Sequence, residues 1–414
     1  METRLRFPVL MIGLLVLGAV GAQPARAQDS GTGPQVPKAW IGDVPDGMWY
    51  DAQTGQLRDD PLERDATIAA LDRGLDPAEL ITQLRAQQKL DTALNILQDR
   101  YADSFEGLYW ADTSHAVAQF KSPIPDDAWA LLAGTGVPIT LQIVRYSSAD
   151  LNRLQDELAA SLRELGLRDY AVASDTRAQG LVATIGKSGP RALPSEEEIR
   201  ARLPGQLLSV DIHMEFVNGP VALPWSVLGG AIDGQNPDLW CTSGFSVYSG
   251  STQGTATAGH CGTSMNWYKN PFTGATHSLT YKNGYIGTWG DFEWFTSNGA
   301  ITDDFYHTSA GSVTDVSSVK SSFSVGDTLY WYGQATNQEH NGTVSYTRVA
   351  AGGRDHLVCM SNNQGGPGDS GGPVYAGGSA AGYIFGSVNL NGWRMCFSEA
   401  AYIDDAIGVS IKLS

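Results

Sequence analysis

The sequence is poor in cysteine, in basic residues and in long apolar runs. It holds 4 cysteines among 414 residues and no C-x-x-C or H-E-x-x-H motif, so no zinc, other metal or cofactor is expected. Lys and Arg number 27 against 44 Asp and Glu, and the net charge of −17 makes nucleic acids and anionic membranes poor partners. Beyond the first 22 residues, no apolar run approaches the length that spans a bilayer.

The N-terminus has the pattern of a secretory signal peptide. Arg4 and Arg6 precede an apolar run over residues 7–22, and a small-x-small cleavage site ends at Ala27. A membrane anchor is the less favoured alternative, because the run is short and interrupted. Residues 1–27 are therefore predicted to be a signal peptide that is removed, which makes the mature protein secreted and extracellular.

The few cysteines all lie in the C-terminal half of the chain. An even number of cysteines in an exported protein favours disulfides over metal ligation. Three pairings are possible, and we expect near neighbours to pair, as Cys241–Cys261 and Cys359–Cys396. Closing the shorter of these loops would stabilise the fold by ~3 kcal/mol.

A change of composition near residue 224 divides the chain. Residues 1–223 hold 20 of the 27 Lys and Arg and 30 of the 44 Asp and Glu. Beyond this point charges become rare, while Gly, Ser, Thr, Trp and Tyr become frequent. After the signal peptide we therefore expect one domain over residues 28–224 and a second over residues 225–414.

The first of these domains combines helical and strand patterns. Leucine stripes predict helices within residues 61–104 and over residues 151–165. Strand-like segments are found at residues 139–144, 170–173, 181–185 and 210–216. Alternation in the last segment places His213 on a solvent face, and no catalytic constellation is found here. The domain is interpreted as an α+β accessory to the second one.

The second domain has no helical stripe until its very end. Short β-rich runs are separated at close intervals by clusters of Gly, Asn and Ser, a pattern that is typical of an all-β sandwich or barrel.

Within this β domain, the stretch PGDSGGP surrounds Ser370 with small residues. Glycine permits strained turns and lets another molecule approach the main chain closely. Acyl transfer requires main-chain N–H donors beside a nucleophile, and a serine hydroxyl also needs a base within hydrogen-bond reach. Ser370 is therefore the candidate nucleophile.

The candidate base is His260, in the stretch TATAGHCG, because histidine titrates near neutrality. Its candidate partner is Asp291, since the aromatic residues of GDFEWF can bury this carboxylate at a strand end. Asp369 adjoins the nucleophile in sequence and is better placed to brace its loop.

The motifs TAGHC, GDFEWF and GDSGGP, in the order His–Asp–Ser, resemble those of the chymotrypsin-fold serine peptidases. LGGAIDG, CTSGFSV and GTATAGHC are similar to the bacterial secreted branch that contains α-lytic protease and the streptogrisins. The similarity covers residues 225–414. It implies an all-β double six-stranded barrel and the activity of a secreted serine endopeptidase.

The resemblance also implies a role for each residue of the site. Ser370 would attack the peptide carbonyl, His260 would act first as base and then as acid, and Asp291 would orient His260. The N–H groups of Gly368 and Ser370 would form the oxyanion hole. The strand that binds polypeptide substrates would contain Phe385, Gly386 and Ser387.

The first domain resembles, more faintly, the large pro-regions of this branch, through the stretch SFEGLYWADTSHAVAQF. Those pro-regions assist folding of the protease and occupy its active site until they are cut away. Residues 28–224 are therefore expected to be a pro-region, and an unrelated accessory domain is the alternative. Maturation is expected between Asn218 and Ser226, and the mature protein is expected to be a monomer.

Two departures from the family pattern concern specificity and the support of the triad. The loop between Cys359 and Gly368 is long and contains no acid, which disfavours Lys or Arg at P1, and no basic lining for glutamate is evident. An apolar or aromatic P1 residue remains the expectation. In the substrate strand, either Phe385 replaces the serine that supports the triad aspartate, or Ser387 takes its place through a shifted register.

Two smaller alternatives stay open. The arginine that usually pairs with the acid before the nucleophile is not evident, so Asp369 is expected to pair with one of Arg348, Arg354 and Arg394. Asn341-Gly342-Thr343 matches a glycosylation acceptor, but a hairpin turn is favoured.

Three functions are compatible with these patterns. A secreted serine endopeptidase made as a preproenzyme is favoured. A catalytically degenerate trypsin-fold binding module and an esterase-like hydrolase are the alternatives.

Overall fold

The computed structural model describes residues 49–50, 57–58, 62–63, 66–67, 70, 74–187, 193–224, 241–270, 274–307 and 313–414. The predicted signal peptide and the first residues of the second predicted domain, 225–240, lie outside these residues. In the part of the chain that is described, no helix is long and apolar enough to cross a membrane.

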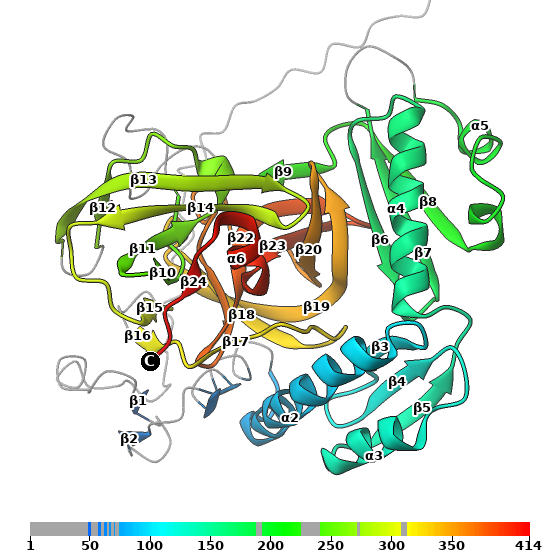
Figure 1. Ribbon diagram of the computed structural model, residues 1–414, viewed down its shortest axis with the longest axis horizontal. Coiled ribbons are helices and arrows are strands. Elements are labelled where there is room, and N and C mark those ends of the chain that lie inside the picture. Colours follow the sequence, from blue (N-terminus) through cyan, green and yellow to red (C-terminus); the bar gives the residue numbers. More distant parts are fainter. Residues whose placement is uncertain are drawn as a thin grey trace, which may run out of the picture.

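The N-terminal part begins with an α+β unit (Figure 1). Its sheet has the order β3-β4-β5 and is formed by Phe105–Trp110, Ala116–Phe120 and Ile139–Ile143. Its helices are α2 (Pro77–Tyr101) and α3 (Asp126–Gly134). Pro77 pre-sets the first turn of α2, and the Asp76 side chain accepts the Ala78 N–H at 2.9 Å. The predicted helix within residues 61–104 is thereby confirmed.

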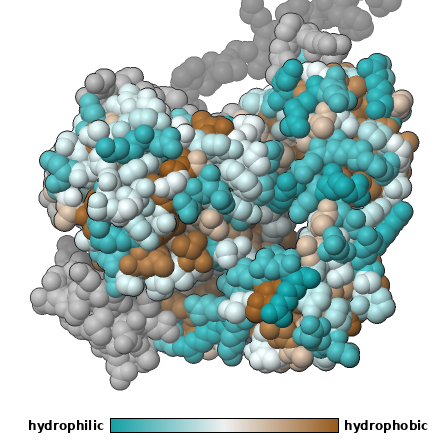
Figure 2. All heavy atoms as spheres, viewed as in Figure 1, coloured by the Kyte–Doolittle hydropathy of each residue, from teal (hydrophilic) through white to brown (hydrophobic). Residues whose placement is uncertain are grey.

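A second α+β unit follows, formed by α4 (Ser148–Glu164), α5 (Glu196–Arg200), the short 3-10 helix η2 (Leu207–Ser209) and strands β6 (Tyr170–Asp175), β7 (Gly180–Gly186) and β8 (Ile212–Val217). A capping box between Ser147 and Asp150 starts α4, which confirms the helix predicted from the leucine stripe. Its leucines pack in one core with residues of β6, β7 and β8. The outward face of α4 is hydrophilic (Figure 2). His213 is exposed, as expected, but Phe216 is also 36% exposed although its strand alternates.

The C-terminal part is built almost entirely from strands, which confirms the β-rich prediction. One sheet has the order β12-β13-β14-β11-β10-β24. Its strands are Trp267–Lys269, Thr276–Gly287, Gly290–Ser297, Thr252–Thr257, Ser246–Ser249 and Ser410–Ile411, in that spatial order. Short pieces β1 (Trp49–Tyr50), β2 (Leu57–Arg58), β15 (Asp304–Tyr306), β16 (Val313–Asp315) and β17 (Ser318–Val319) lie outside it.

The other strands of the C-terminal part close into a ring. The order β18-β21-β22-β23-β20-β19 is completed by pairing of β18 with β19. The six strands are Thr328–Gly333, Pro373–Ala376, Ser379–Asn389, Trp393–Glu399, Arg354–Met360 and Gln338–Ala351. The 3-10 helix η4 (Ala400–Tyr402) and helix α6 (Ile403–Ile407) follow β23. Among the described strands, no pairing closes the first sheet in the same way, so a double barrel stays a prediction.

The two parts of the chain share one sheet. Strand β6 of the N-terminal part pairs antiparallel with β19, in the register Val349↔Ala173, Ala350↔Val172 and Ala351↔Ala171. In Figure 1, β6 to β8 stand beside the orange strands β19 and β20. The sequence patterns predicted these strands but not their partner, because alternation indicates which face is buried and says nothing about the neighbouring strand.

A buried polar cluster joins the same two parts elsewhere. The Asp327 carboxylate accepts hydrogen bonds from Gln87 Nε2 at 3.0 Å and from Trp110 Nε1 at 3.1 Å. Lys320 lies 3.3 Å from Asp327 and 2.5 Å from Asp91. Because the N-terminal part supplies Gln87, Asp91 and Trp110, separating the two parts would leave buried polar groups of both without these partners.

Candidate active site

Ser370 lies on the loop between β20 and β21 and is fully buried. Gly368 and Gly371 have φ values of +96° and +81°, which side chains rarely adopt. A Cβ atom on Gly371 would stand 1.8 Å from Thr257 Oγ1. The small residues around Ser370 are therefore required both by the turn and by the close approach of β11.

His260 and Asp291 are brought to this loop from the first sheet. His260 belongs to the short 3-10 helix η3 (Gly259–Cys261), which directly follows β11, and Asp291 is the second residue of β14. His260 Nε2 lies 2.9 Å from Ser370 Oγ, and His260 Nδ1 lies 2.6 Å from Asp291 Oδ2. The His260 N–H donates to Asp291 Oδ1 at 2.8 Å. The three side chains predicted to act together thus form one hydrogen-bonded line.

Both predicted disulfides are present. Cys241–Cys261 ties the residue after His260 to the strand-free segment before β10, and Cys359–Cys396 joins β20 to β23. The first disulfide therefore restrains the backbone that carries the histidine.

Asp291 is completely buried, and its charge is compensated from several sides. Burial alone would raise the pKa of Asp291, but the attraction and hydrogen bonds of His260 and Arg354 hold this pKa below its ordinary value. Arg354 Nη2 donates to Asp291 Oδ2 at 2.8 Å, and the Asp291 N–H donates to Ser398 Oγ at 3.0 Å.

These contacts correct the expected support of the triad. Neither Phe385 nor Ser387 hydrogen-bonds to Asp291; Arg354, 63 residues away in sequence, takes that position. Phe385 is buried with its ring 5.8 Å from the His260 ring, and the Ser387 hydroxyl donates to Asn363 Oδ1 at 2.7 Å. No local motif marked Arg354, because only the pairing of β20 with the ring brings it beneath Asp291.

The expected arginine partner of Asp369 is also wrong. The Asp369 carboxylate accepts hydrogen bonds from the Thr336 N–H, the Thr336 hydroxyl and the Gly366 N–H at 2.9 to 3.0 Å. Burial outweighs these hydrogen bonds and raises the pKa of Asp369. Arg348 instead pairs with Asp156 of α4 at 3.1 Å, and Arg394 donates to main-chain and hydroxyl oxygens.

The loop before Ser370 is held by hydrogen bonds to the strands β18 and β19. Asn362 Nδ2 donates to Asn341 O at 2.9 Å, and Trp331 Nε1 donates to Gln364 O at 3.1 Å.

Asn341 lies within strand β19 and is 8% exposed, so the interpretation of Asn341-Gly342 as a hairpin turn is wrong.

Two main-chain donors beside Ser370 are available to a ligand. The carbonyl groups of Gly368 and Ser370 accept from the Thr242 hydroxyl and the Thr242 N–H, each at 2.8 Å. The Asp369 carbonyl accepts a hydrogen bond from the Gly372 N–H. The peptide group between Asp369 and Ser370 is trans, so its N–H, which belongs to Ser370, points in the direction opposite to that carbonyl. Within the described residues, neither the Gly368 nor the Ser370 N–H donates to any acceptor.

A second carboxyl, not anticipated from the sequence, lies near the triad. Glu293 is 1% exposed on β14, two residues after Asp291. Burial, followed by the nearby charge of Asp291, raises the pKa of Glu293 to about 9. Burial therefore favours the neutral form of the Glu293 side chain.

Strand β22, which contains the predicted substrate-binding residues, is already paired. Pro224, Leu223 and Ala222 of β9 (Ala222–Pro224) lie antiparallel to Gly386, Ser387 and Val388. The Asn389 N–H also donates to Val221 O at 2.8 Å. Ser370 Oγ lies 3.4 Å from Phe385 O, one residue before this pairing. An extended segment of the chain's own N-terminal part thus runs along β22 towards Ser370.

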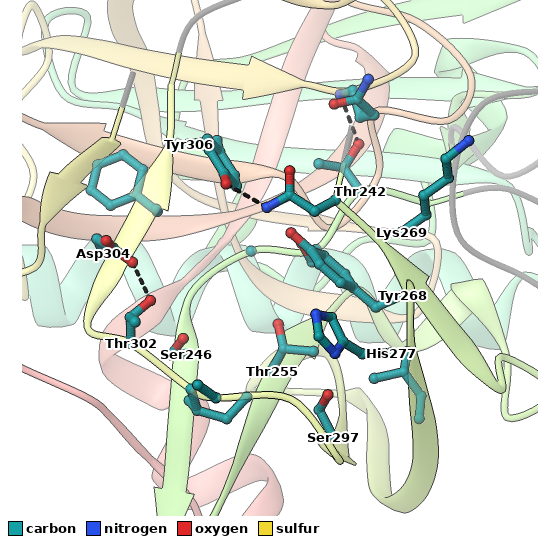
Figure 3. Close-up of a pocket in the computed structure, with 18 of the residues that line it drawn as sticks. Thr242, Ser246, Thr255, Tyr268, Lys269, His277, Ser297, Thr302, Asp304 and Tyr306 are labelled. Atoms are coloured by element: carbon teal, nitrogen blue, oxygen red, sulfur yellow. Dashed lines mark hydrogen bonds between the residues drawn. The ribbon is translucent and has the colours of Figure 1, made fainter. Parts of the chain in front are cut away.

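A separate cavity of about 170 Å³ adjoins the other side of the nucleophile loop (Figure 3). Thr242, which holds the carbonyl groups of that loop, is part of its wall. Tyr268 and His277 stack inside it with ring centroids 6.3 Å apart, and Asn270 hydrogen-bonds to Tyr306. The cavity is lined by none of Ser370, His260 and Asp291, so it neighbours their hydrogen-bonded line without being part of it.

Among the described residues, no group of three or more His, Cys, Asp and Glu side chains is placed to hold a metal ion.

The chain was also compared with known proteins. No protein-family model and no curated protein matches the sequence. Solved structures similar to a part of this chain include a Cellulomonas bogoriensis chymotrypsin, at 23% identity and a TM-score of 0.35, with a match that covers 45% of this chain and 99% of the solved one.

Two further structures give the same result. Thermobifida fusca protease A has 24% identity and a TM-score of 0.34, and Nocardiopsis protease has 21% identity and a TM-score of 0.36. Each covers 45% of this chain and 98% of its own. Because these identities and TM-scores are low, the function is inferred from the geometry of the site and not from the similar structures.

Proposed function

We propose that this chain is a secreted serine endopeptidase made as a preproenzyme. The observation that carries the proposal is the line from Ser370 Oγ through the His260 ring to the Asp291 carboxylate, with distances of 2.9 Å and 2.6 Å. A hydroxyl, an imidazole and a buried carboxylate in this order are what nucleophilic acyl transfer requires.

The proposed reaction uses each group in turn. Ser370 Oγ attacks the carbonyl carbon of the scissile peptide while its proton passes to His260 Nε2, and Asp291 holds the opposite ring nitrogen protonated. The carbonyl oxygen becomes an oxyanion that accepts hydrogen bonds from the Gly368 and Ser370 N–H groups. Each of these hydrogen bonds stabilises the transition state by about 3 kcal/mol. The amine leaves with the proton from Nε2. Water then attacks the acyl-enzyme by the same route.

The N-terminal part is proposed to be the pro-region, which occupies the substrate strand before it is cut. Support comes from β9, which lies along Gly386–Val388 as a peptide substrate would. Strand β9 ends at Pro224, opposite Gly386, and the carbonyl of the neighbouring Phe385 lies 3.4 Å from Ser370 Oγ. Trp225, the next residue in the sequence, lies outside the described residues. We therefore assign maturation to the Trp225–Ser226 bond, at the end of the window expected from the sequence.

The same register supports an apolar or aromatic P1 preference. If Trp225 is the P1 residue of the chain's own cleavage site, the pocket must accept a large aromatic side chain. The facing residues Gly386, Ser387 and Val388 carry no charge that would select Lys, Arg or Glu.

Active-site labelling together with a cleavage profile tests the proposed function. A fluorophosphonate should modify Ser370 of the mature protein, and the labelled residue is identified by peptide mass spectrometry. Digestion of a denatured protein mixture should give cleavage mainly after large apolar or aromatic residues, and N-terminal sequencing of the mature form should begin at Ser226. An unlabelled Ser370 would favour the binding module. Hydrolysis of esters without hydrolysis of peptides would favour the esterase.

The contact between the two parts of the chain is predicted to weaken as the pH rises. Glu106 of β3 and Glu399 of β23 line one cavity of about 340 Å³ between the parts, with Arg348 and His356 in the same wall. Burial raises the pKa of both carboxyls to about 8, although Thr176 opposes this for Glu106 and Arg348 for Glu399. A raised carboxyl pKa stabilises the contact fully below about pH 4, and this contribution is lost as the pH approaches 8.

Urea unfolding of the full-length Ser370→Ala chain, which cannot process itself, measures this effect. The urea concentration at which the N-terminal part separates should decrease as the pH is raised from 5 to 9. Substituting both carboxyls, as Glu106→Gln and Glu399→Gln, should flatten that dependence. Glu164→Gln, at the exposed end of α4, is the matched control. An equally steep dependence in the double variant would contradict the prediction.

A further inference from the structure

Arg354 lies against the carboxylate of Asp291. Its Nη2 atom and His260 Nδ1 both approach the same oxygen, Asp291 Oδ2, at 2.8 Å and 2.6 Å. Both side chains of the Arg354–Asp291 pair are buried, with 8% and 0% exposed. A charge pair withdrawn from water in this way interacts much more strongly than one on the surface.

The position of the Arg354 guanidinium is fixed by further contacts. Its central carbon lies 4.9 Å from the Phe385 ring centroid, and its Nη1 atom donates to Gly352 O. The Phe385 ring in turn meets the His260 ring edge-on, with centroids 5.8 Å apart. Arg354, Phe385, His260 and Asp291 therefore form a closed cycle of contacts, and moving any one of them disturbs the other three.

We propose that Arg354 is a positioning residue of the catalytic site, which locks the Asp291 carboxylate towards His260 and sets the lower pH limit of activity. The inference rests on the proposed function, because it assigns a role within the Ser370–His260–Asp291 line.

The direction of the pH effect follows from Coulomb's law. Catalysis needs a neutral imidazole that can take the Ser370 proton, and the negative charge of Asp291 favours the imidazolium instead. A fixed positive charge 2.8 Å from the same carboxylate oxygen offsets part of that attraction. Removing the charge of Arg354 is therefore expected to lower activity first on the acid side of the pH profile.

The other ionisable groups near this cycle make no hydrogen bond or ion pair with the Asp291 carboxylate within the described residues. Glu293 follows on β14 and is buried, and Asp369 lies on the nucleophile loop with its carboxylate hydrogen-bonded to Thr336 and Gly366. Asp355 and His356 follow Arg354 along β20 but bond to Thr288. Besides His260, Arg354 is thus the one basic side chain that contacts Asp291 within the described residues.

Three substitutions separate charge from hydrogen bonding. Arg354→Lys keeps the charge but not the planar fork, Arg354→Gln keeps a donor without charge, and Arg354→Met removes both. In the Gln and Met variants, the acid limb of the kcat/KM profile should move to higher pH by about 1 unit, equivalent to a tenfold change in the ionisation equilibrium. In the Lys variant the limb should stay in place while kcat falls. Arg394→Met, which removes another guanidinium stacked on an aromatic ring (Tyr346, 5.3 Å), should not move it.

The effect of Arg354 on His260 can also be measured in a variant that does not catalyse the reaction. In the Ser370→Ala background, the ring protons of His260 can be followed by NMR across pH, and the titration midpoint should rise by a similar amount in the Gln and Met variants. A wild type that hydrolyses no peptide would refute the proposed function and leave this titration as the test of Arg354. An unchanged midpoint or limb in both neutral variants would overturn the inference, as would a shift in Arg354→Lys equal to that in Arg354→Met. If the Met variant does not fold, the Lys and Gln variants decide.

Discussion

The Ser370→Ala variant is expected to lose peptide hydrolysis almost completely, with kcat/KM lowered about 10⁵- to 10⁶-fold. Removing the nucleophile abolishes the acyl-enzyme route, and only binding and the oxyanion donors remain to accelerate direct attack by water. The same variant should accumulate as the uncut 414-residue chain or its signal-cleaved form, since processing at Trp225–Ser226 would need Ser370. Hydrolysis of a chromogenic peptide and the mass of the secreted product are the two measurements.

The matched control for this loss is Ser324→Ala. Ser324 is also a buried serine, but its hydroxyl has no hydrogen-bond partner in the described part of the chain. Its replacement should leave processing and activity within about twofold of the wild type, because no contact or charge is lost. Unchanged processing in Ser370→Ala would contradict the assignment of Ser370, provided that the protein contains no contaminating protease. Mixing it with catalytic amounts of the wild type checks whether the junction is still cleavable.

Asp291→Asn is expected to damage activity and stability together. An amide cannot hold the required His260 tautomer, and kcat should fall about 10⁴-fold. The Arg354 guanidinium would in addition become a buried cation without its carboxylate, which typically costs 3–5 kcal/mol. Steady-state kinetics at neutral pH and urea unfolding of the purified variant measure the two effects separately.

A double substitution separates these two consequences. Asp291→Asn with Arg354→Met removes both charges of the buried pair, so a large part of the lost stability should return. Activity should not return, because His260 remains without its orienting carboxylate. Recovery of activity in the double variant would contradict the orienting role of Asp291. An Asp291→Asn protein as stable as the wild type would show that the Arg354–Asp291 pair does not stabilise the fold as described.

The local patterns identified what depends on neighbours in sequence. The glycines around Ser370, the aromatic residues around Asp291 and the leucine stripe of residues 151–165 each indicate a local structure, and the structure contains the corresponding turn, buried strand and helix. Pairing of the four cysteines was open to three solutions, and the near-neighbour choice is the one that forms.

The missed features depend on contacts between distant segments. Arg354 reaches Asp291 only because β20 joins the strand ring, and a single arginine after two glycines has no pattern that predicts this. Asp369 uses Thr336 rather than a cation, since the turn after β18 presents an N–H and a hydroxyl at the right distance. Strand β22 was expected to receive substrate, but the register with β9 could not be deduced from alternation.

The shared sheet has a consequence for the protein after processing. Strand β19 is covered along Val349–Ala351 by β6, and those residues are small and apolar. If the N-terminal part is removed as proposed, the main chain of β19 loses its hydrogen-bonding neighbour β6 along these residues and becomes an open sheet edge, to which another extended chain could pair. In this proposal the N-terminal part, besides lying along β22, also protects the protein against self-association, and the mature enzyme would lack that protection.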